Sequence, residues 1–118
     1  GNVHWERILS DILEQIPKNE SFSYRVFDCG VMDLGDAVQV TPKTLNILEG
    51  SYSTHPELIG RYDLKIFLKT SPETQSARIL KRNGPARHKM FVEKWIPLEN
   101  LYFTSYPVEK QCDLVFTT

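Results

Sequence analysis

The spacing of apolar residues changes along the first third of the chain. Residues 3–16 carry apolar side chains three and four positions apart, which predicts an amphipathic helix that ends at Pro17. Residues 21–29 instead alternate apolar and polar side chains, as in a strand, and residues 37–40 repeat that alternation after a Gly- and Asp-containing stretch. The pattern therefore predicts an antiparallel hairpin with a long turn over residues 30–36.

Two short apolar runs follow the hairpin. Residues 44–50 form a mostly apolar run that ends in Glu-Gly, and residues 63–70 form a second one. Continuous apolar runs of this length are typical of strands buried in a parallel sheet. We therefore expect both runs to be strands of an α/β domain.

Helical segments and a last strand complete the pattern. Ser71, Pro72 and Glu73 suit the N-cap, the first helical position and the first turn of a helix that extends to residue 82. The tripeptide at 83–85, Asn-Gly-Pro, ends it. Residues 88–104 predict one or two helices interrupted at Pro97, in which Phe91, Trp95, Leu98 and Tyr102 share a face, and residues 113–116 predict a strand. Strands that alternate with helices predict parallel pairing through right-handed crossovers.

Composition places the chain among ordinary soluble proteins. Its 118 residues suit one domain over 1–118, and the net charge of −1 gives no global attraction to nucleic acid or to an anionic membrane. No apolar run approaches the roughly 18 residues that span a bilayer. The two cysteines, Cys29 and Cys112, lie far apart, which favours reduced thiols in the cytoplasm over a disulfide or a metal site.

The first candidate for phosphate binding is the stretch from Gly30 to Gly35, which has the GxxxxG spacing of a P-loop. Asp36 and Ala37 follow it, where a P-loop needs Lys and then Ser or Thr. An aspartate at that position repels phosphate. The stretch therefore predicts a hairpin turn.

Glu49 is the candidate ligand for a metal ion. A carboxylate at the C-terminal end of a parallel strand lies where α/β proteins bind ligands, and it can hold Mg²⁺ directly or through water. The alternative is a solvated glutamate before a turn glycine. The residues alone leave both interpretations open.

Two further groups carry possible chemistry. Arg78 and Arg82 are four residues apart on one helix face, and Arg87 follows in a Gly-Pro loop; such arginines suit phosphate recognition, although a solvated basic face is the alternative. Asp28 lies beside Tyr24 and Phe27 at a strand end, where it can orient a base or a sugar or simply close a turn. Lys81 and His88 complete the basic group.

An ordered set of short segments resembles one family of kinases. The segments are 2–7 (NVHWER), 27–29 (FDC), 48–56 (LEGSYSTHP), 62–68 (YDLKIFL), 78–84 (RILKRNG), 95–103 (WIPLENLYF) and 112–116 (CDLVF). In this order they resemble the uridine kinase / phosphoribulokinase family of P-loop kinases, over nearly all of the chain. The resemblance covers only the part of the family domain that follows the P-loop.

The resemblance implies a fold and an activity. The fold would be a partial P-loop NTPase of the nucleoside-kinase type, with three layers, a mainly parallel sheet and a small antiparallel hairpin. The activity would be transfer of a phosphoryl group from ATP or GTP, with Mg²⁺, to the 5′-hydroxyl of uridine or cytidine.

The resemblance also implies residue roles. Glu49 would be the Walker-B-region carboxylate near Mg²⁺, and Arg78, Arg82 and Arg87 would form a lid over the phosphates. The substrate side would carry the hairpin residues and one histidine, namely Tyr24, Phe27, Asp28 and His55.

The chain departs from the family at several points. Arg82 is followed by Asn83 where the family's lid usually has aspartate, and residues 31–33 are Val-Met-Asp where its hairpin usually carries His and Arg. The family's first strand, its GxxxxGK[ST] loop and its presumed general base would all precede residue 1. We therefore expect this chain alone to be inactive, with unpaired strand edges that favour a homo-oligomer. The alternative function is a non-catalytic nucleotide- or protein-binding domain derived from the kinase fold.

Overall fold

Two small β-sheets and a set of helices make up the part of the protein that the structure, a computed structural model, describes: residues 3–118. These residues divide into two units, Val3–Ser53 and Thr54–Thr118. The chain is therefore mixed α/β, as expected, and the single domain expected over 1–118 stays a prediction. Within the described residues, none of the helices combines the length and the apolar character needed to cross a bilayer.

The predicted antiparallel hairpin is the sheet of the first unit. Strand β1 (Phe22–Asp28) pairs with β2 (Asp33–Val40), so that Asp28 lies opposite Asp33. The turn is shorter than expected, because β2 begins at Asp33 rather than at residue 37. The register shifts between Arg25 and Phe27, and the Arg25 guanidinium donates to the backbone carbonyls of Leu34 (2.7 Å) and Gly35 (3.0 Å). Arg25 therefore stabilises an irregularity that would otherwise leave these carbonyls to solvent.

The N-terminal segment is helical, as predicted, but not as one α-helix. Helix α1 (Trp5–Ile8) continues as a π-helix, η1 (Leu9–Leu13), in which the Glu14 amide donates to the Leu9 carbonyl at 2.9 Å. The expected end at Pro17 is wrong, because Pro17 lies inside a 3₁₀ turn, η2 (Ile16–Lys18). Proline fits the first turn of a helix, where its missing N–H has no partner to lose.

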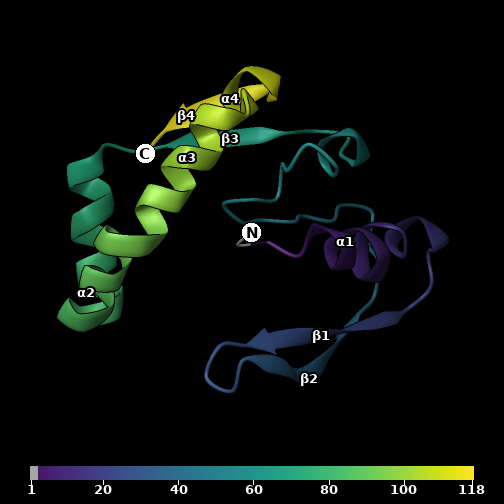
Figure 1. Ribbon diagram of the computed structural model, residues 1–118. Helices are drawn as coiled ribbons and strands as arrows, with labels where there is room; N and C mark the ends of the chain where they lie inside the picture. Colours follow the sequence, from purple (N-terminus) through teal and green to yellow (C-terminus); the bar gives the residue numbers. More distant parts are fainter. Residues whose placement is uncertain (1–2) are drawn as a thin grey trace. The chain divides into compact units, whose positions relative to one another are not determined.

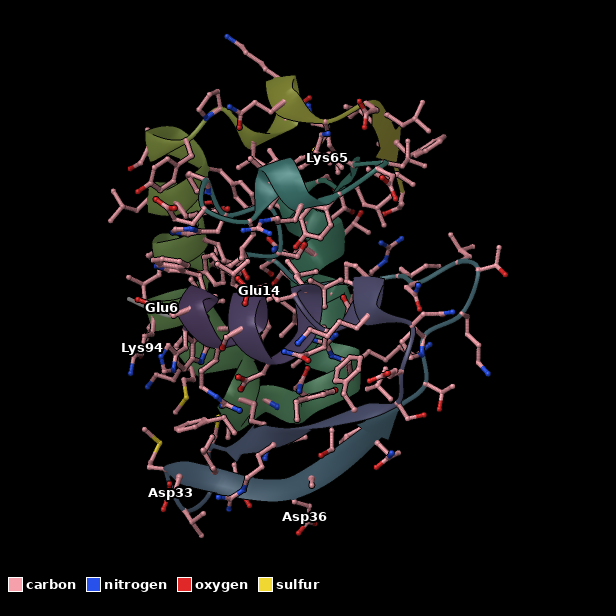
Figure 2. All side chains as sticks on the ribbon, turned by 90° about the vertical axis from the view of Figure 1, so that its right-hand side faces the viewer. Glu6, Glu14, Asp33, Asp36, Lys65 and Lys94 are labelled. Carbon is pink, nitrogen blue, oxygen red and sulfur yellow. The ribbon has the colours of Figure 1, made fainter. Side chains whose placement is uncertain are left out.

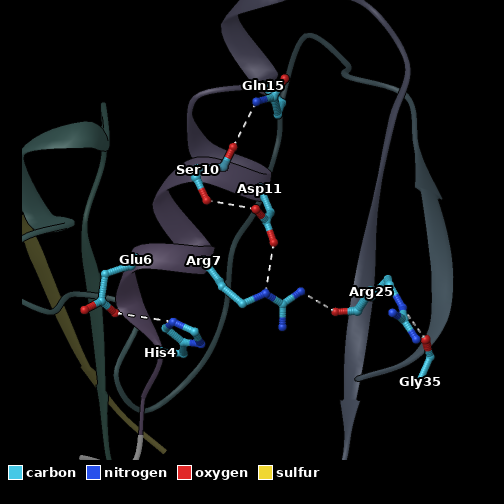
Figure 3. A network of polar contacts seen from close by, with 8 residues as sticks. All are labelled: His4, Glu6, Arg7, Ser10, Asp11, Gln15, Arg25 and Gly35. Atoms are coloured by element: carbon cyan, nitrogen blue, oxygen red, sulfur yellow. Dashed lines mark hydrogen bonds and ion pairs between the residues drawn. The ribbon is translucent and has the colours of Figure 1, made fainter. Parts of the chain in front are cut away.

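Arg7 links this helical segment to the hairpin. Its Nε donates to Asp11 Oδ2 at 3.0 Å, and its Nη2 donates to the Arg25 carbonyl at 2.8 Å (Figure 3). Ser10 Oγ donates to the other oxygen of the same carboxylate at 2.8 Å. The network joins α1, η1 and β1 within the first unit.

The strand predicted over residues 44–50 is wrong. The segment pairs with no strand among residues 3–118, and two of its apolar side chains are open to solvent: Leu45 is 75% and Ile47 is 82% exposed. In the described part of the first unit, the sheet consists of β1 and β2. An apolar run becomes a strand only where neighbours pair its backbone groups, and this run has none within its unit.

The second unit contains the predicted parallel pair. Strand β3 (Ile66–Lys69) pairs in parallel with β4 (Leu114–Thr117), and α2 (Pro72–Met90), η4 (Phe91–Trp95), α3 (Ile96–Ser105) and α4 (Val108–Gln111) connect them (Figure 1). A short 3₁₀ turn, η3 (Ile59–Arg61), precedes β3. The parallel pairing expected from strand–helix–strand order is confirmed, while the sheet described here has two strands rather than the larger sheet of a three-layer fold.

The helix boundaries follow the predicted signals. The Ser71 hydroxyl accepts the Thr74 amide at 3.1 Å and caps α2, with Pro72 at its first position. The helix loses helical geometry at Gly84 (φ 80°, ψ 171°), where Asn-Gly-Pro predicted its end, and then resumes. Pro97 lies in the first turn of α3.

The core lies in the second unit. Among the described residues, the buried apolar side chains are Leu58, Ile79, Tyr102 and Val108, from four segments of this unit. Tyr102 is the most buried of the face predicted on residues 91–102, and Leu98 is exposed. Much of the β3–β4 sheet is open, since Leu68 is 65% and Phe116 is 51% exposed.

Candidate functional site

The candidate substrate side begins with three residues of β1. Tyr24 is half-buried, whereas Phe27 and Asp28 are exposed near the turn. The Asp28 Oδ1 accepts the Gly30 amide at 2.7 Å, which closes the turn in the way aspartates do at strand ends. The structure thus gives Asp28 a role in the turn, and its second oxygen remains available for other contacts.

The stretch from Gly30 to Gly35 is the hairpin turn that its sequence predicts. Met32 adopts a left-handed conformation (φ 55°), and the Asp33 Oδ1 accepts the Leu34 amide at 2.7 Å. Asp33 and Asp36 are exposed on β2 (Figure 2). Two carboxylates here oppose a phosphate group, and the turn forms no phosphate cradle. These residues therefore do not fit the triphosphate of ATP.

Glu49 lies in the extended segment that follows the hairpin. Its side chain is exposed, and the next residues form a turn in which the Ser53 amide and hydroxyl donate to the Gly50 carbonyl at 3.1 and 2.9 Å. Within residues 3–118 no three His, Cys, Asp or Glu side chains gather as a metal site. Mg²⁺ in phosphoryl-transfer sites is commonly coordinated by one or two carboxylates together with phosphate oxygens and water. A single exposed carboxylate such as Glu49 is compatible with that ligand set.

His55 belongs to an aromatic cluster of the second unit. Its ring stacks on Tyr102 at a centroid distance of 6.5 Å and lies tilted against Tyr106 at 6.0 Å. Its Nδ1 accepts the Glu57 amide at 3.2 Å, and its carbonyl accepts the amides of Leu58 and Ile59. These contacts give His55 a structural role beside the buried Tyr102.

The three predicted lid arginines lie on α2. The loop expected at Arg87 is wrong, because the chain leaves helical geometry at Gly84 only and is helical again at Arg87. Arg78 Nη1 donates to Thr118 Oγ1 at 3.0 Å, and Arg82 Nε donates to Asn83 Oδ1 at 2.7 Å. Arg87 is exposed beyond the Gly84 break, and its guanidinium makes no side-chain hydrogen bond or ion pair with the described residues. Because a guanidinium has five N–H donors, Arg78 and Arg82 keep donors for a phosphate.

The predicted site residues therefore fall into separate groups. Tyr24, Phe27 and Asp28 lie together on the hairpin, followed along the chain by Glu49, all in the first unit. His55 and the three arginines belong to the second unit. The structure places the three hairpin residues on one strand and the three arginines on one helix, and their relation to Glu49, to His55 and to each other stays a prediction.

The chain matches no protein-family model and no curated protein. The resemblance to the uridine kinase / phosphoribulokinase family therefore depends on the ordered segments alone.

Sequence reasoning missed one polar pair on α2. Ser76 Oγ and His88 Nε2 lie 2.7 Å apart and are part-buried. His88 appears in the sequence only as a member of a basic group, and Ser76 gives no signal, because a separation of twelve residues predicts no contact on a helix.

Tyr62 and Cys112 have raised pKa values. Burial, and then the neighbouring Tyr102, raise the pKa of Tyr62 to about 12. Burial, together with Asp113, raises the pKa of the Cys112 thiol. Both changes favour the neutral forms, which suits structural positions better than nucleophilic ones.

Proposed function

We propose that this chain is part of a nucleoside kinase and contributes its phosphate lid, its Mg²⁺ carboxylate and its nucleoside-side hairpin. The reaction is phosphoryl transfer from ATP or GTP to the 5′-hydroxyl of uridine, cytidine or a related nucleoside. The observation that carries the proposal is α2: it begins directly after a parallel strand, bears Arg78 and Arg82 four residues apart, and breaks at Gly84 before Arg87.

The arginines would bind the transferred phosphate and exclude water. Bound MgATP would supply the phosphoryl group. Guanidinium groups match phosphate oxygens in a two-pronged geometry and stabilise the negative charge of the transition state. The break at Gly84 separates Arg82 from Arg87, so that the two guanidinium groups can approach a phosphate from different directions.

The remaining residues would bind the acceptor and the metal. Phe27 offers an exposed ring against which a base can stack, and Asp28 offers a carboxylate to a sugar hydroxyl. Tyr24 supports the same strand, Glu49 would hold Mg²⁺ through an oxygen or a water, and His55 supports the loop that follows. The proposal requires a phosphate cradle that the 118 residues do not contain, since no GxxxxGK[ST] sequence occurs among them.

The missing cradle favours a second candidate for the isolated chain, a nucleotide- or protein-binding domain without catalysis. The 118-residue chain is expected to phosphorylate neither uridine nor cytidine in a radiometric assay with ATP and Mg²⁺. Turnover by this chain would contradict our account of the missing cradle.

The deciding experiment uses protein expressed from the complete native reading frame. We expect ATP- or GTP-dependent phosphorylation of a pyrimidine nucleoside, lost in Glu49→Gln. Arg82→Ala should lower kcat by about 100-fold, the effect of removing one positioned donor from a transition state, with little change in nucleoside KM. Lys89→Ala removes an exposed cation from the same helix and is the matched control. Absence of phosphorylation with all four ribonucleosides would refute the kinase and leave the binding domain.

A further inference from the structure

Helix α2 turns back on itself. Twelve residues separate Ser76 from His88, and a continuous α-helix would hold them about 18 Å apart at 1.5 Å per residue. The Ser76 Oγ and His88 Nε2 atoms instead lie 2.7 Å apart. The helix therefore consists of a first limb, residues 72–83, and a second limb, residues 85–90, joined at Gly84 (Figure 1).

Local chemistry explains the position of the break. Gly84 has φ 80° and ψ 171°, a region of backbone space that is essentially restricted to glycine. Pro85 follows and has no N–H with which to continue the helical ladder. Arg82 Nε donates to Asn83 Oδ1 at 2.7 Å, immediately before the break.

Few side chains of α2 are buried. Among the residues of α2, Ile79 is the one that is buried, whereas Leu80 is 44% and Met90 is 54% exposed. Ser76–His88 is the side-chain hydrogen bond that the structure records between the two limbs in the described chain. Segments with few buried contacts open at a low free-energy cost, so one hydrogen bond has a measurable weight here.

We propose that Gly84 is a hinge and that the Ser76–His88 hydrogen bond is the latch that holds the two limbs of α2 closed. The serine hydroxyl can donate to Nε2 or accept from it, depending on the tautomer of the imidazole, so the bond forms with either ring nitrogen protonated.

The latch positions the predicted lid arginines. Arg82 ends the first limb, and Arg87 lies on the second limb next to His88. Opening the hinge changes the distance between the two guanidinium groups, so Ser76 and His88 are positioning residues. This last step rests on the proposed function, whereas the hinge and its latch do not.

The test measures the distance between the limbs in the 118-residue chain without nucleotide. Spin labels at Glu73→Cys and Lys89→Cys, both exposed, report on the limbs in a Cys29→Ser/Cys112→Ser background. A straight helix would separate these positions by about 24 Å, and the closed hairpin holds them nearer. We expect one short distance for the otherwise native chain.

Removing the hydroxyl should populate the open form. Ser76→Ala should raise the ratio of open to closed molecules about five-fold, which corresponds to the net contribution of one hydrogen bond. Ser76→Thr keeps the hydroxyl and should restore the short distance. Ser105→Ala is the matched control, because its hydroxyl donates to the Leu101 carbonyl within α3, away from the hinge.

His88→Phe removes the other partner of the Ser76–His88 hydrogen bond. It is the deciding variant for the latch if Ser76→Ala loses helical circular dichroism. It keeps a ring and removes the nitrogen, so the open population should rise as in Ser76→Ala. Distance distributions in both variants that superimpose on that of the native chain would overturn the latch. Because no nucleotide is present, this result is independent of whether the complete protein phosphorylates nucleosides.

Discussion

Gly84→Ala is the substitution that tests most directly whether the break in α2 is required by the fold. The backbone at Gly84 has φ 80° and ψ 171°, and a Cβ placed there would meet no atom within 4 Å. The cost of alanine is therefore conformational rather than steric. Backbone strain of this kind costs about 1–3 kcal/mol per residue.

Part of this cost is offset in the unfolded state. Replacing glycine by alanine restricts the unfolded chain, which stabilises the fold by about 0.4–1 kcal/mol where the native backbone suits alanine. The net expectation is a loss of about 1–2 kcal/mol in the free energy of unfolding. For a unit of this size, each 1 kcal/mol lowers Tm by about 4–8 °C.

Gly60→Ala is the matched control. A Cβ at Gly60 also meets nothing within 4 Å, and Gly60 does not have the positive φ of Gly84. Gly60→Ala should therefore be neutral or slightly stabilising. The assay is urea unfolding followed by the fluorescence of Trp95, in a Trp5→Phe background so that the signal reports the second unit. Equal midpoints for both alanine variants would refute the assignment of Gly84 as a residue that must be glycine.

Three further predictions concern Tyr62, the two cysteines and Asp113. The pKa of Tyr62 is about 12 in the folded protein, above its ordinary value of 10.0, so the contribution of this side chain to stability is complete below pH 10 and is lost as the pH rises toward 12. Tyr62→Phe should remove this loss in alkaline unfolding followed by circular dichroism. Cys29 is exposed, whereas burial raises the pKa of the Cys112 thiol. Iodoacetamide at about pH 8 should therefore modify Cys29 first, which peptide mass spectrometry measures. Equal modification rates would contradict the burial of Cys112. The Asp113 carboxylate accepts the Lys65 backbone amide at 2.8 Å and lies 3.7 Å from the Lys65 Nζ. Asp113→Ala should therefore lower the free energy of unfolding in urea by about 1–2 kcal/mol. This loss should change little with salt, because the amide hydrogen bond contributes more than the exposed ion pair.

The elements predicted correctly are those whose signals lie within a few residues. Alternation defined β1, and Ser71 followed by Pro72 defined the start of α2, because strand faces and helix caps depend on neighbours in sequence. Asn-Gly-Pro predicted the break at Gly84 for the same reason. The parallel pairing of β3 with β4 followed from their order with helices between them.

The segment 44–50 shows where this reasoning fails. Its apolar residues match those of a buried strand, yet Leu45 and Ile47 are exposed and unpaired. Whether an apolar run becomes a strand depends on a neighbouring strand, which periodicity within the run does not contain. The register shift after Arg25 could not be predicted from the sequence of β1 either, because it depends on which residues of β2 face β1.

The candidate site was predictable in its residue types more than in its geometry. Arg78 and Arg82 share α2 as expected. Asp28 lies at the end of β1, the position expected of it both as a ligand for a base or a sugar and as a turn residue. His55 was predicted on the substrate side from resemblance alone, and that role stays a prediction; the structure adds its contacts with Tyr102 and Tyr106. A histidine beside aromatic residues far along the chain has no local signature.

The Ser76–His88 hydrogen bond depends on the break in α2 that the Asn-Gly-Pro sequence at 83–85 predicts. On an unbroken helix the two side chains would lie several turns apart, and neither would have a reason to be paired. Once Gly84 reverses the chain, the same separation brings a hydroxyl and an imidazole within 2.7 Å. The break therefore creates the contact, and the contact in turn stabilises the break. Gly84→Ala and Ser76→Ala should consequently act on one equilibrium, and their effects on the distance between the limbs should not be independent.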